Sequence, residues 1–243
     1  MEISEELAEI IGIHLGDGCI SKTTKYQEYA INGDITEERE YYDNHVLPIY
    51  NSNIFKPILG KEIIAKNYEK NGTYGIYVFN EKIVSFFEQL GIKSGVKLDH
   101  EIPDCILKNK RLWKFFLRGI FDTDGSIYFN KNYSVKIENR KHNRPRIKLG
   151  MTSKKIIKAV RFMLEELGYN IYQKPSYKGK KDKNAVHSIM IQRKKDIERF
   201  IKEIGFKSSK HLTKWQIYKI KGYCPPNTKL KERYQIINET KVF

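Results

Sequence analysis

The sequence contains two copies of one unit, and this repeat constrains the fold more than any other feature. Residues 10–18 read IIGIHLGDG and residues 117–125 read LRGIFDTDG. Two further segments recur in the same order, AINGDITEE (30–38) as RIKLGMTSK (146–154) and EKIVSFFEQLGIKSG (81–95) as KDIERFIKEIGFKSS (195–209). The spacing between copies differs by a few residues, as changes in loop length would produce. The repeat therefore predicts two similar halves that pack against each other.

In the first half, hydrophobic periodicity predicts a helix that begins after Ser4 and ends at Asp17-Gly18. Ser4 is a suitable N-cap, Glu5 and Glu6 suit the first turn, and glycine is a common residue at a helix end. The remaining pattern predicts strands at 19–25 and 28–35, a helix at 37–49, strands at 61–68 and 73–79 joined at Asn71-Gly72, and a helix at 81–90.

The second half follows the same order of elements. We expect a helix at 110–124, strands at 126–132 and 145–151, a helix at 153–167, strands at 170–175 and 186–192, a helix at 194–204 and a last helix at 209–220. The tail from Lys221 has no clear pattern. The predicted fold class is α/β (α+β), with two αββαββα halves at 1–104 and 105–222, a tail at 223–243, and sheets that contain antiparallel strands.

Both helices that end in Asp-Gly carry small residues at matching places, with Gly12 and Gly16 in one and Gly119 and Thr123 in the other. A glycine inside a helix costs roughly 1 kcal/mol relative to alanine, so its presence in both copies suggests a close helix–helix contact. If the two helices pack side by side, Asp17 and Asp124 meet at their C-terminal ends.

Two carboxylates that meet at two negative helix ends repel each other, and a divalent cation relieves that repulsion. Oxygen ligands favour Mg²⁺, and less specifically Mn²⁺ or Ca²⁺. A metal pair held in this way is a standard device for hydrolysing phosphodiesters. The repeat pairs Asp122 with Leu15, so we expect Asp122 to make a polar contact at a helix end instead of binding metal.

The chain is strongly basic, with 45 Lys and Arg against 29 Asp and Glu and a net charge of +16. Such a surface attracts polyanions, of which nucleic acid is the commonest. The alternative is that the lysine-rich composition reflects only a hot or AT-rich source. Three scattered cysteines show no disulfide or zinc spacing, and no apolar run approaches the ~18 residues of a membrane span. We expect an intracellular protein without a targeting signal.

Alternation along the predicted strands separates an apolar side, which packs on helices, from a polar side that stays open. In 144–151, Ile147, Leu149 and Met151 share one side, so the basic residues between them share the other. Such side chains suit phosphate contacts and base-edge hydrogen bonds, and a solvated sheet face is the plainer alternative. The candidate DNA-binding residues are Ser21, Thr23, Lys25, Asn32, Lys66, Tyr68, Tyr74, Tyr128, Asn130, Arg144, Arg146 and Lys148.

At IIGIHLGDG and LRGIFDTDG, the sequence resembles the LAGLIDADG family of homing endonucleases, in particular its monomeric double-motif members. The resemblance implies two central motif helices, a pseudo-two-fold monomer and a duplex bound on saddle-shaped sheets. It implies that Asp17 and Asp124 bind metal, with the backbone carbonyls of Gly16 and Thr123 as further ligands. It also implies cleavage of both strands across a minor groove, leaving short 3′ overhangs.

The resemblance also draws attention to the residues before the second motif. Many family members have a lysine shortly before an Ile-Pro pair. Here the stretch is KLDHEIPDCI (97–106), so His100 takes that place and Lys97 lies three residues earlier, and KSSKHL (207–212) offers Lys210 in the second half. Lys97, Lys210 and His100 are candidate catalytic residues that could stabilise charge or shuttle a proton, or could be phosphate contacts or solvated charges.

The sequence therefore predicts a Mg²⁺-dependent, site-specific DNA endonuclease that acts in intron homing. The first alternative is an RNA-splicing maturase or a non-cleaving DNA-binding protein of the same fold. The second is a small-substrate phosphatase, which would leave the charge of +16 unexplained. Met1 and the absence of a His-Asn ending favour a free-standing or intron-encoded protein over one embedded in an intein.

Overall fold

The computed structural model describes residues 2–134, 136, 141–180 and 183–241. In the first half, the helices and strands are α1 (Glu5–Asp17), β1 (Gly18–Lys22), β2 (Gln27–Asp34), α2 (Arg39–Tyr41), α3 (Leu47–Tyr50), α4 (Lys56–Leu59), β3 (Lys66–Tyr68), β4 (Thr73–Phe79), α5 (Glu81–Gln89) and α6 (Asp104–Leu107). In the second half they are α7 (Trp113–Thr123), β5 (Gly125–Lys131), β6 (His142–Met151), α8 (Lys154–Glu166), β7 (Ile171–Tyr177), β8 (Val186–Ile191), α9 (Lys194–Glu203), α10 (Ser209–Lys221) and α11 (Leu230–Lys241).

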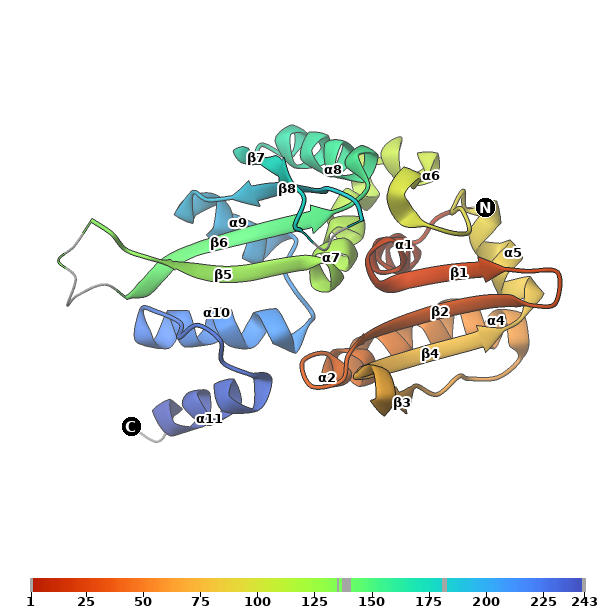
Figure 1. The fold of residues 1–243 in the computed structure, drawn as a ribbon, viewed down its shortest axis with the longest axis horizontal. Helices are drawn as coiled ribbons and strands as arrows, with labels where there is room; N and C mark the ends of the chain where they lie inside the picture. The colour runs from red at the N-terminus through yellow and green to blue at the C-terminus, as the bar shows by residue number, and fades with distance from the viewer. Residues whose placement is uncertain (1, 135, 137–140, 181–182, 242–243) are drawn as a thin grey trace.

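Each half contains one four-stranded antiparallel sheet, ordered β1-β2-β4-β3 in the first and β5-β6-β8-β7 in the second. α1 and α7 pack together at the centre of the molecule, and the two sheets extend away from them on opposite sides (Figure 1). α5 lies against β2, while α8 lies against β6 and β8, so helices cover one face of each sheet. The predicted fold class and the pseudo-symmetric halves are confirmed.

Local sequence signals account for the first helix. The N-cap hydroxyl of Ser4 accepts a hydrogen bond from the Leu7 amide at 3.1 Å, as the sequence predicts. The helix ends at Asp17, but Gly18 has extended backbone angles and does not adopt a left-handed cap. A Cβ atom at Gly18 would lie 2.2 Å from Nδ1 of His14, so close packing explains this glycine better than turn geometry does.

The structure differs from the sequence prediction at three elements. The region predicted as a helix at 37–49 continues to Leu59, because Pro48 and Pro57 each fall at the first turn of a new helical segment after a π-helical turn. Only Lys66–Tyr68 of the strand predicted at 61–68 forms. The tail also forms α11, which packs on α10 below β5 in Figure 1.

Candidate metal centre and nucleic-acid interface

The contact between α1 and α7 depends on glycine at one position in each helix. A Cβ atom at Gly12 would lie 2.2 Å from the carbonyl oxygen of Phe116, and one at Gly119 would lie 2.2 Å from the carbonyl oxygen of Glu9. Real Cβ atoms do not approach a backbone this closely, so no other residue fits without moving the helices. The expected close contact between the two motif helices is confirmed.

The same contact continues to the C-terminal ends of the helices. A Cβ atom at Gly16 would lie 1.9 Å from Oγ1 of Thr123 and 3.5 Å from the amide nitrogen of Asp124. The helix ends are therefore side by side, which places Asp17 and Asp124 at one junction between the halves. Asp17 is half-buried and Asp124 is exposed, so the junction opens to solvent on the Asp124 side.

Asp17 lies in an environment that disfavours its charge. Desolvation by the surrounding protein raises the pKa of Asp17 well above its usual value, and the negative charges of Glu38 and Asp124 raise the pKa further. Lys210 and the hydroxyl of Tyr42, which donates to Oδ2 of Asp17 at 3.0 Å, oppose this shift. An ionised Asp17 therefore needs additional positive charge nearby.

Asp124 behaves in the same way. Desolvation raises the pKa of Asp124, and Glu38 adds to that rise, while Lys97 and Lys210 counteract it. Lys210 lowers the pKa of Asp17, and the charges of Asp17 and Asp124 raise the pKa of Lys97. The two lysines and the two aspartates therefore form one electrostatically interacting group. The sequence predicted four of these residues, and Glu38 was missed.

The two lysines approach the carbonyl groups that precede the two aspartates. Nζ of Lys97 donates to the carbonyl oxygen of Gly16. Nζ of Lys210 donates to the carbonyl oxygen of Thr123 at 3.2 Å and to Oε1 of Glu38 at 2.5 Å. Burial lowers the pKa of Lys97, while the nearby Asp124 and Asp17 act in the opposite direction.

His100 makes no side-chain hydrogen bond with either aspartate in the part of the chain that the structure describes. Its imidazole is buried, and neither ring nitrogen has a hydrogen-bond partner among the described residues. Burial lowers the pKa of His100, and the charges of Lys97 and Lys93 lower it further. The catalytic role of His100 therefore stays a prediction.

Asp122 makes the polar helix-end contact that the sequence predicts. Its carboxylate accepts hydrogen bonds from the backbone amides of Lys207 and Ser208 at 3.0–3.1 Å, just before α10 begins. Burial raises the pKa of Asp122 to about 7 despite these hydrogen bonds. Asp122 thus joins α7 to α10 and does not face the two candidate metal ligands.

This raised pKa predicts a measurable pH dependence of stability. The contribution of Asp122 is complete below its usual pKa of 3.8 and is lost as the pH rises through about 7, because the folded protein retains a proton that the unfolded chain releases. We expect wild type to lose stability relative to Asp122→Asn between pH 4 and 7, in urea unfolding with a chelator present. The exposed variant Asp104→Asn is the control, and a pH-independent difference for Asp122→Asn would contradict the assignment.

The residues at the helix ends fit a hard divalent cation. They provide two carboxylates and two backbone carbonyls, an all-oxygen set typical of Mg²⁺ sites. In the present geometry the ammonium groups of Lys97 and Lys210 contact those carbonyls, so both carbonyl oxygens already face positive charge. No cluster of three or more metal-binding side chains occurs among the described residues, so a bound ion would need water or substrate oxygens to complete its shell.

The open face of the second sheet carries the basic residues that strand alternation predicts. Tyr128 pairs with Arg146, Ser126 pairs with Lys148, and Asn130 pairs with Arg144, so all six side chains share one face. Ile147 and Leu149 are fully buried on the opposite face. Arg146 donates to the backbone carbonyl of Gln192 at 3.3 Å, whereas Lys148 makes no ion pair among the described residues.

The open face of the first sheet differs from the prediction at one residue. Asn32 pairs with Gly75 and Lys66 pairs with Gly75 from the other side, which places Asn32 and Lys66 on the open face together with Tyr68 and Tyr77. Tyr74 points the opposite way: it is 6% exposed, and its hydroxyl donates to Asp43. The assignment of Tyr74 to the DNA-facing surface was therefore wrong, because Gly75 and Tyr77 take the open face of β4 and Tyr74 takes the face that packs on the helices.

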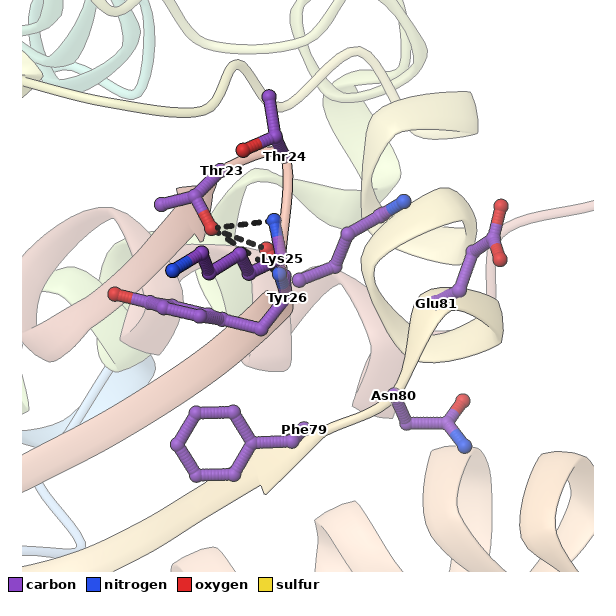
Figure 2. Close-up of a pocket in the computed structure, with 8 residues that line it drawn as sticks. Thr23, Thr24, Lys25, Tyr26, Phe79, Asn80 and Glu81 are labelled. Atoms are coloured by element: carbon purple, nitrogen blue, oxygen red, sulfur yellow. Dashed lines mark hydrogen bonds between the residues drawn. The ribbon is translucent and has the colours of Figure 1, made fainter.

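The remaining candidates of the first half lie toward the end of its sheet. Ser21 is on β1, while Thr23 and Lys25 are in the turn between β1 and β2. This turn lines a shallow pocket of about 370 Å³ in which the rings of Tyr26 and Phe79 meet edge to face at 5.7 Å (Figure 2). Both rings are exposed, and the sequence did not single them out because strand pairing brings them together from distant positions.

Comparison with known proteins agrees with this architecture. Residues 112–205 match the LAGLIDADG-like domain family. A structure of mesophilic variants of the homing endonuclease I-DmoI superimposes with a TM-score of 0.57 and 16% identity, covering 84% of this chain and 97% of that one. The meganuclease I-SmaMI superimposes with a TM-score of 0.52 and 12% identity, covering 97% and 96%.

Curated relatives match over most of this chain but are much longer. The glutamine–fructose-6-phosphate aminotransferase of Methanocaldococcus jannaschii is 29% identical over 89% of this chain, which spans 18% of that protein. The replication factor C small subunit of the same organism is 30% identical over 88% of the chain, which spans 10% of it. The match of residues 112–205 to the LAGLIDADG-like domain family, together with the central helix pair and the two sheets, shows that this chain has the fold of the double-motif LAGLIDADG endonucleases.

Proposed function

We propose that this protein is a site-specific double-strand DNA endonuclease that uses Mg²⁺ bound by Asp17 and Asp124. The observation that carries the proposal is the meeting of one carboxylate from each half at the junction between two open sheet faces. Structures of the similar protein I-DmoI include complexes with DNA and Mn and with target DNA in the presence of Mg. Those complexes support the same partners for this chain.

In this mechanism the chain provides a preorganised acidic site that faces a phosphodiester. Asp17, Asp124 and the carbonyl oxygens of Gly16 and Thr123 would hold the cations. A bound divalent ion supplies an activated water and stabilises charge on the phosphate oxygens. Tyr42 fixes the orientation of Asp17 through its hydrogen bond to Oδ2. One aspartate from each half suits cleavage of both strands, with short 3′ overhangs as the expected product.

Lys97 and Lys210 provide the second part of the site. Each ammonium group lies at a carbonyl next to a candidate metal ligand, close enough to stabilise negative charge on a phosphate that is undergoing attack. Because the Gly16 and Thr123 carbonyls occupy equivalent places in the two halves, this arrangement supports one lysine assisting the cleavage of each DNA strand. His100 stays a candidate only through its neighbour Lys97, whose charge lowers the pKa of the imidazole.

The open sheet faces would bind the duplex, and Lys148 offers a direct test. Lys148→Ala is expected to weaken duplex binding and to reduce the slope of log K against log salt by about one, because one phosphate contact is lost. Lys158→Ala removes the same charge from α8, on the helix-covered side, and should leave the slope unchanged. Equal slopes for wild type and Lys148→Ala would exclude Lys148 from the phosphate contacts.

The relatives are much longer than this chain and have unrelated names, which supports the view that the shared region acts as a nuclease by itself. The same region occurs in proteins named as an aminotransferase, a replication factor subunit and a tRNA-splicing ligase, and it makes up only 10–20% of each. A region shared by proteins of such different activities does not perform any one of them. The expectation that this chain is free-standing or intron-encoded stays a prediction.

A selection experiment tests the proposed function. A library of randomised duplexes is incubated with the protein and Mg²⁺, and the cut molecules are captured through their new ends and sequenced. We expect one long recognition sequence, cut at a fixed position in each strand, and no cutting in EDTA. Salt-sensitive duplex binding without cleavage would favour a maturase or a DNA-binding regulator, and the absence of both would exclude DNA as the substrate.

A further inference from the structure

The two lysines at the site differ in what holds them. Lys210 has a carboxylate partner from the other half, since its Nζ lies 2.5 Å from Oε1 of Glu38. Lys97 donates to the backbone of Gly16 and makes no ion pair among the described residues. The repeat aligns Glu38 with Lys154, so the second half has no carboxylate at the matching place. The asymmetry is therefore encoded in the sequence and does not arise from side-chain placement alone.

Glu38 itself is held in a fixed orientation. It is 7% exposed, and its Oε2 accepts a hydrogen bond from the Asp34 amide at 2.7 Å, which leaves Oε1 directed at Lys210. A Cβ atom at Gly33 would lie 2.4 Å from Oε2, so this glycine makes the space that the Glu38 carboxylate occupies. A carboxylate fixed at one oxygen presents the other in a single direction.

The neighbouring residue anchors this segment to the C-terminal helices. Oε2 of Glu37 lies 2.5 Å from a guanidinium nitrogen of Arg233, which is 1% exposed, and Oε1 accepts from the Leu230 amide at 2.8 Å. Nε of Arg233 donates to Oγ1 of Thr213 at 2.9 Å, one turn along α10 from Lys210. Glu37 and Glu38 thus connect the first half to the two helices that carry Arg233 and Lys210.

We propose that Glu38 is a positioning residue that holds the Lys210 ammonium at the tip of α7, so that the two strands of a bound duplex are cut at unequal rates. The proposal rests on the proposed endonuclease function. Lys210 is preorganised by a side chain of the opposite half, whereas the Gly16 carbonyl is the only hydrogen-bond partner of the Lys97 ammonium among the described residues. Preorganised charge stabilises a transition state without the cost of reorganisation, so the strand served by Lys210 should be cut faster.

Strand-resolved single-turnover cleavage tests this inference. The selected duplex is labelled at the 5′ end of one strand or the other. Both rates are measured for wild type, Glu38→Gln, Lys210→Gln, Lys97→Gln and the Glu38→Gln/Lys210→Gln double variant. Glu40→Gln is the matched control: it removes the same charge two residues away, where Glu40 accepts hydrogen bonds from Tyr234 at 2.7–2.8 Å and makes no ion pair with either lysine among the described residues. Duplex affinity without metal and the melting temperature are measured for every variant.

We expect Glu38→Gln to slow the faster strand by roughly 10- to 100-fold, as a small displacement of a catalytic group does, while the slower strand and the metal-free affinity are maintained. Lys210→Gln should slow the same strand, Lys97→Gln the other, and the Glu38→Gln/Lys210→Gln double variant should be no slower than Lys210→Gln.

An equal loss on both strands, or additive losses in the double variant, would overturn the inference and leave the endonuclease function in place. If Glu38→Gln fails to fold, the partly exposed Lys210 carries the test by itself, and loss on both strands in Lys210→Gln overturns the proposal. A wild-type protein that cuts neither strand would refute the endonuclease function together with the inference.

Discussion

Replacing Asp17 with asparagine is expected to lower the single-turnover rate of duplex cleavage by about 1,000-fold or more, and Asp124→Asn is expected to do the same. A correctly held metal ion contributes several kcal/mol to the stabilisation of a phosphoryl transition state, and each 1.4 kcal/mol is a factor of ten in rate. Asparagine retains the size of the side chain but loses the charge that binds the ion. Cleavage in Mg²⁺ is the measurement, and the exposed Asp104→Asn is the control.

The same variants should retain the fold and the affinity for DNA. The pKa of Asp17 is raised by desolvation and by Glu38 and Asp124, so the ionised side chain opposes folding when no metal is present. Asp17→Asn should therefore melt at a higher temperature than wild type at neutral pH in EDTA, and it should bind duplex at least as tightly because a negative charge is removed. Undiminished cleavage by either variant would end the assignment of that residue as a metal ligand.

The sequence was sufficient to predict the parts of the fold that depend on local periodicity and on the repeat. The cap at Ser4 and the paired helices of 10–18 and 117–125 follow from short patterns of residue type. α11 was missed because its buried positions include Arg233, a charged residue that no hydrophobic pattern would place inside. The extension of the helical region to Leu59 was missed because proline usually ends a helix, whereas here each proline starts a new segment after a π-helical turn.

The site was predictable only where the repeat marked it. Asp17 and Asp124 stand at the same place in two copies, and Lys97 and Lys210 stand near family landmarks. Glu38 occurs once and reaches Lys210 across the boundary between the halves, a contact that only the folded chain reveals. The one local signal for Glu38 is a pair of hydrogen bonds similar to a capping box. The Glu38 carboxylate accepts from the Asp34 amide, and the Asp34 carboxylate accepts from the Glu37 amide.

Tyr74 shows the limit of strand alternation. Because successive side chains in a strand point to opposite faces, an error of one residue in register places every residue of that strand on the wrong side. β3 is only three residues long, so its pattern could not fix the register of β4. The result is that Tyr77, and not Tyr74, lies beside Asn32 on the open face, where its hydroxyl accepts from the Asn32 amide at 3.1 Å.

The glycines between α1 and α7 should be among the most sensitive positions for stability. Gly12→Ala and Gly119→Ala would each place a methyl group 2.2 Å from a backbone carbonyl oxygen of the opposite helix. Overpacking of this kind costs up to about 3 kcal/mol, and alanine regains about 1 kcal/mol through its helix propensity. We expect a net loss of about 2 kcal/mol in the free energy of unfolding for each variant, or roughly 4–8 °C in melting temperature.

Gly150→Ala is the control, because its new Cβ would lie 3.5 Å from the nearest atom of another residue and its φ is not positive. Its stability should stay within about 0.5 kcal/mol of wild type. The two interface variants should also lose cleavage at temperatures where they remain folded, since helices forced apart separate the carboxylates that share the cations. If Gly12→Ala and Gly119→Ala are as stable and as active as Gly150→Ala, the helices do not make this close contact in solution, and the metal centre that depends on it is lost as well.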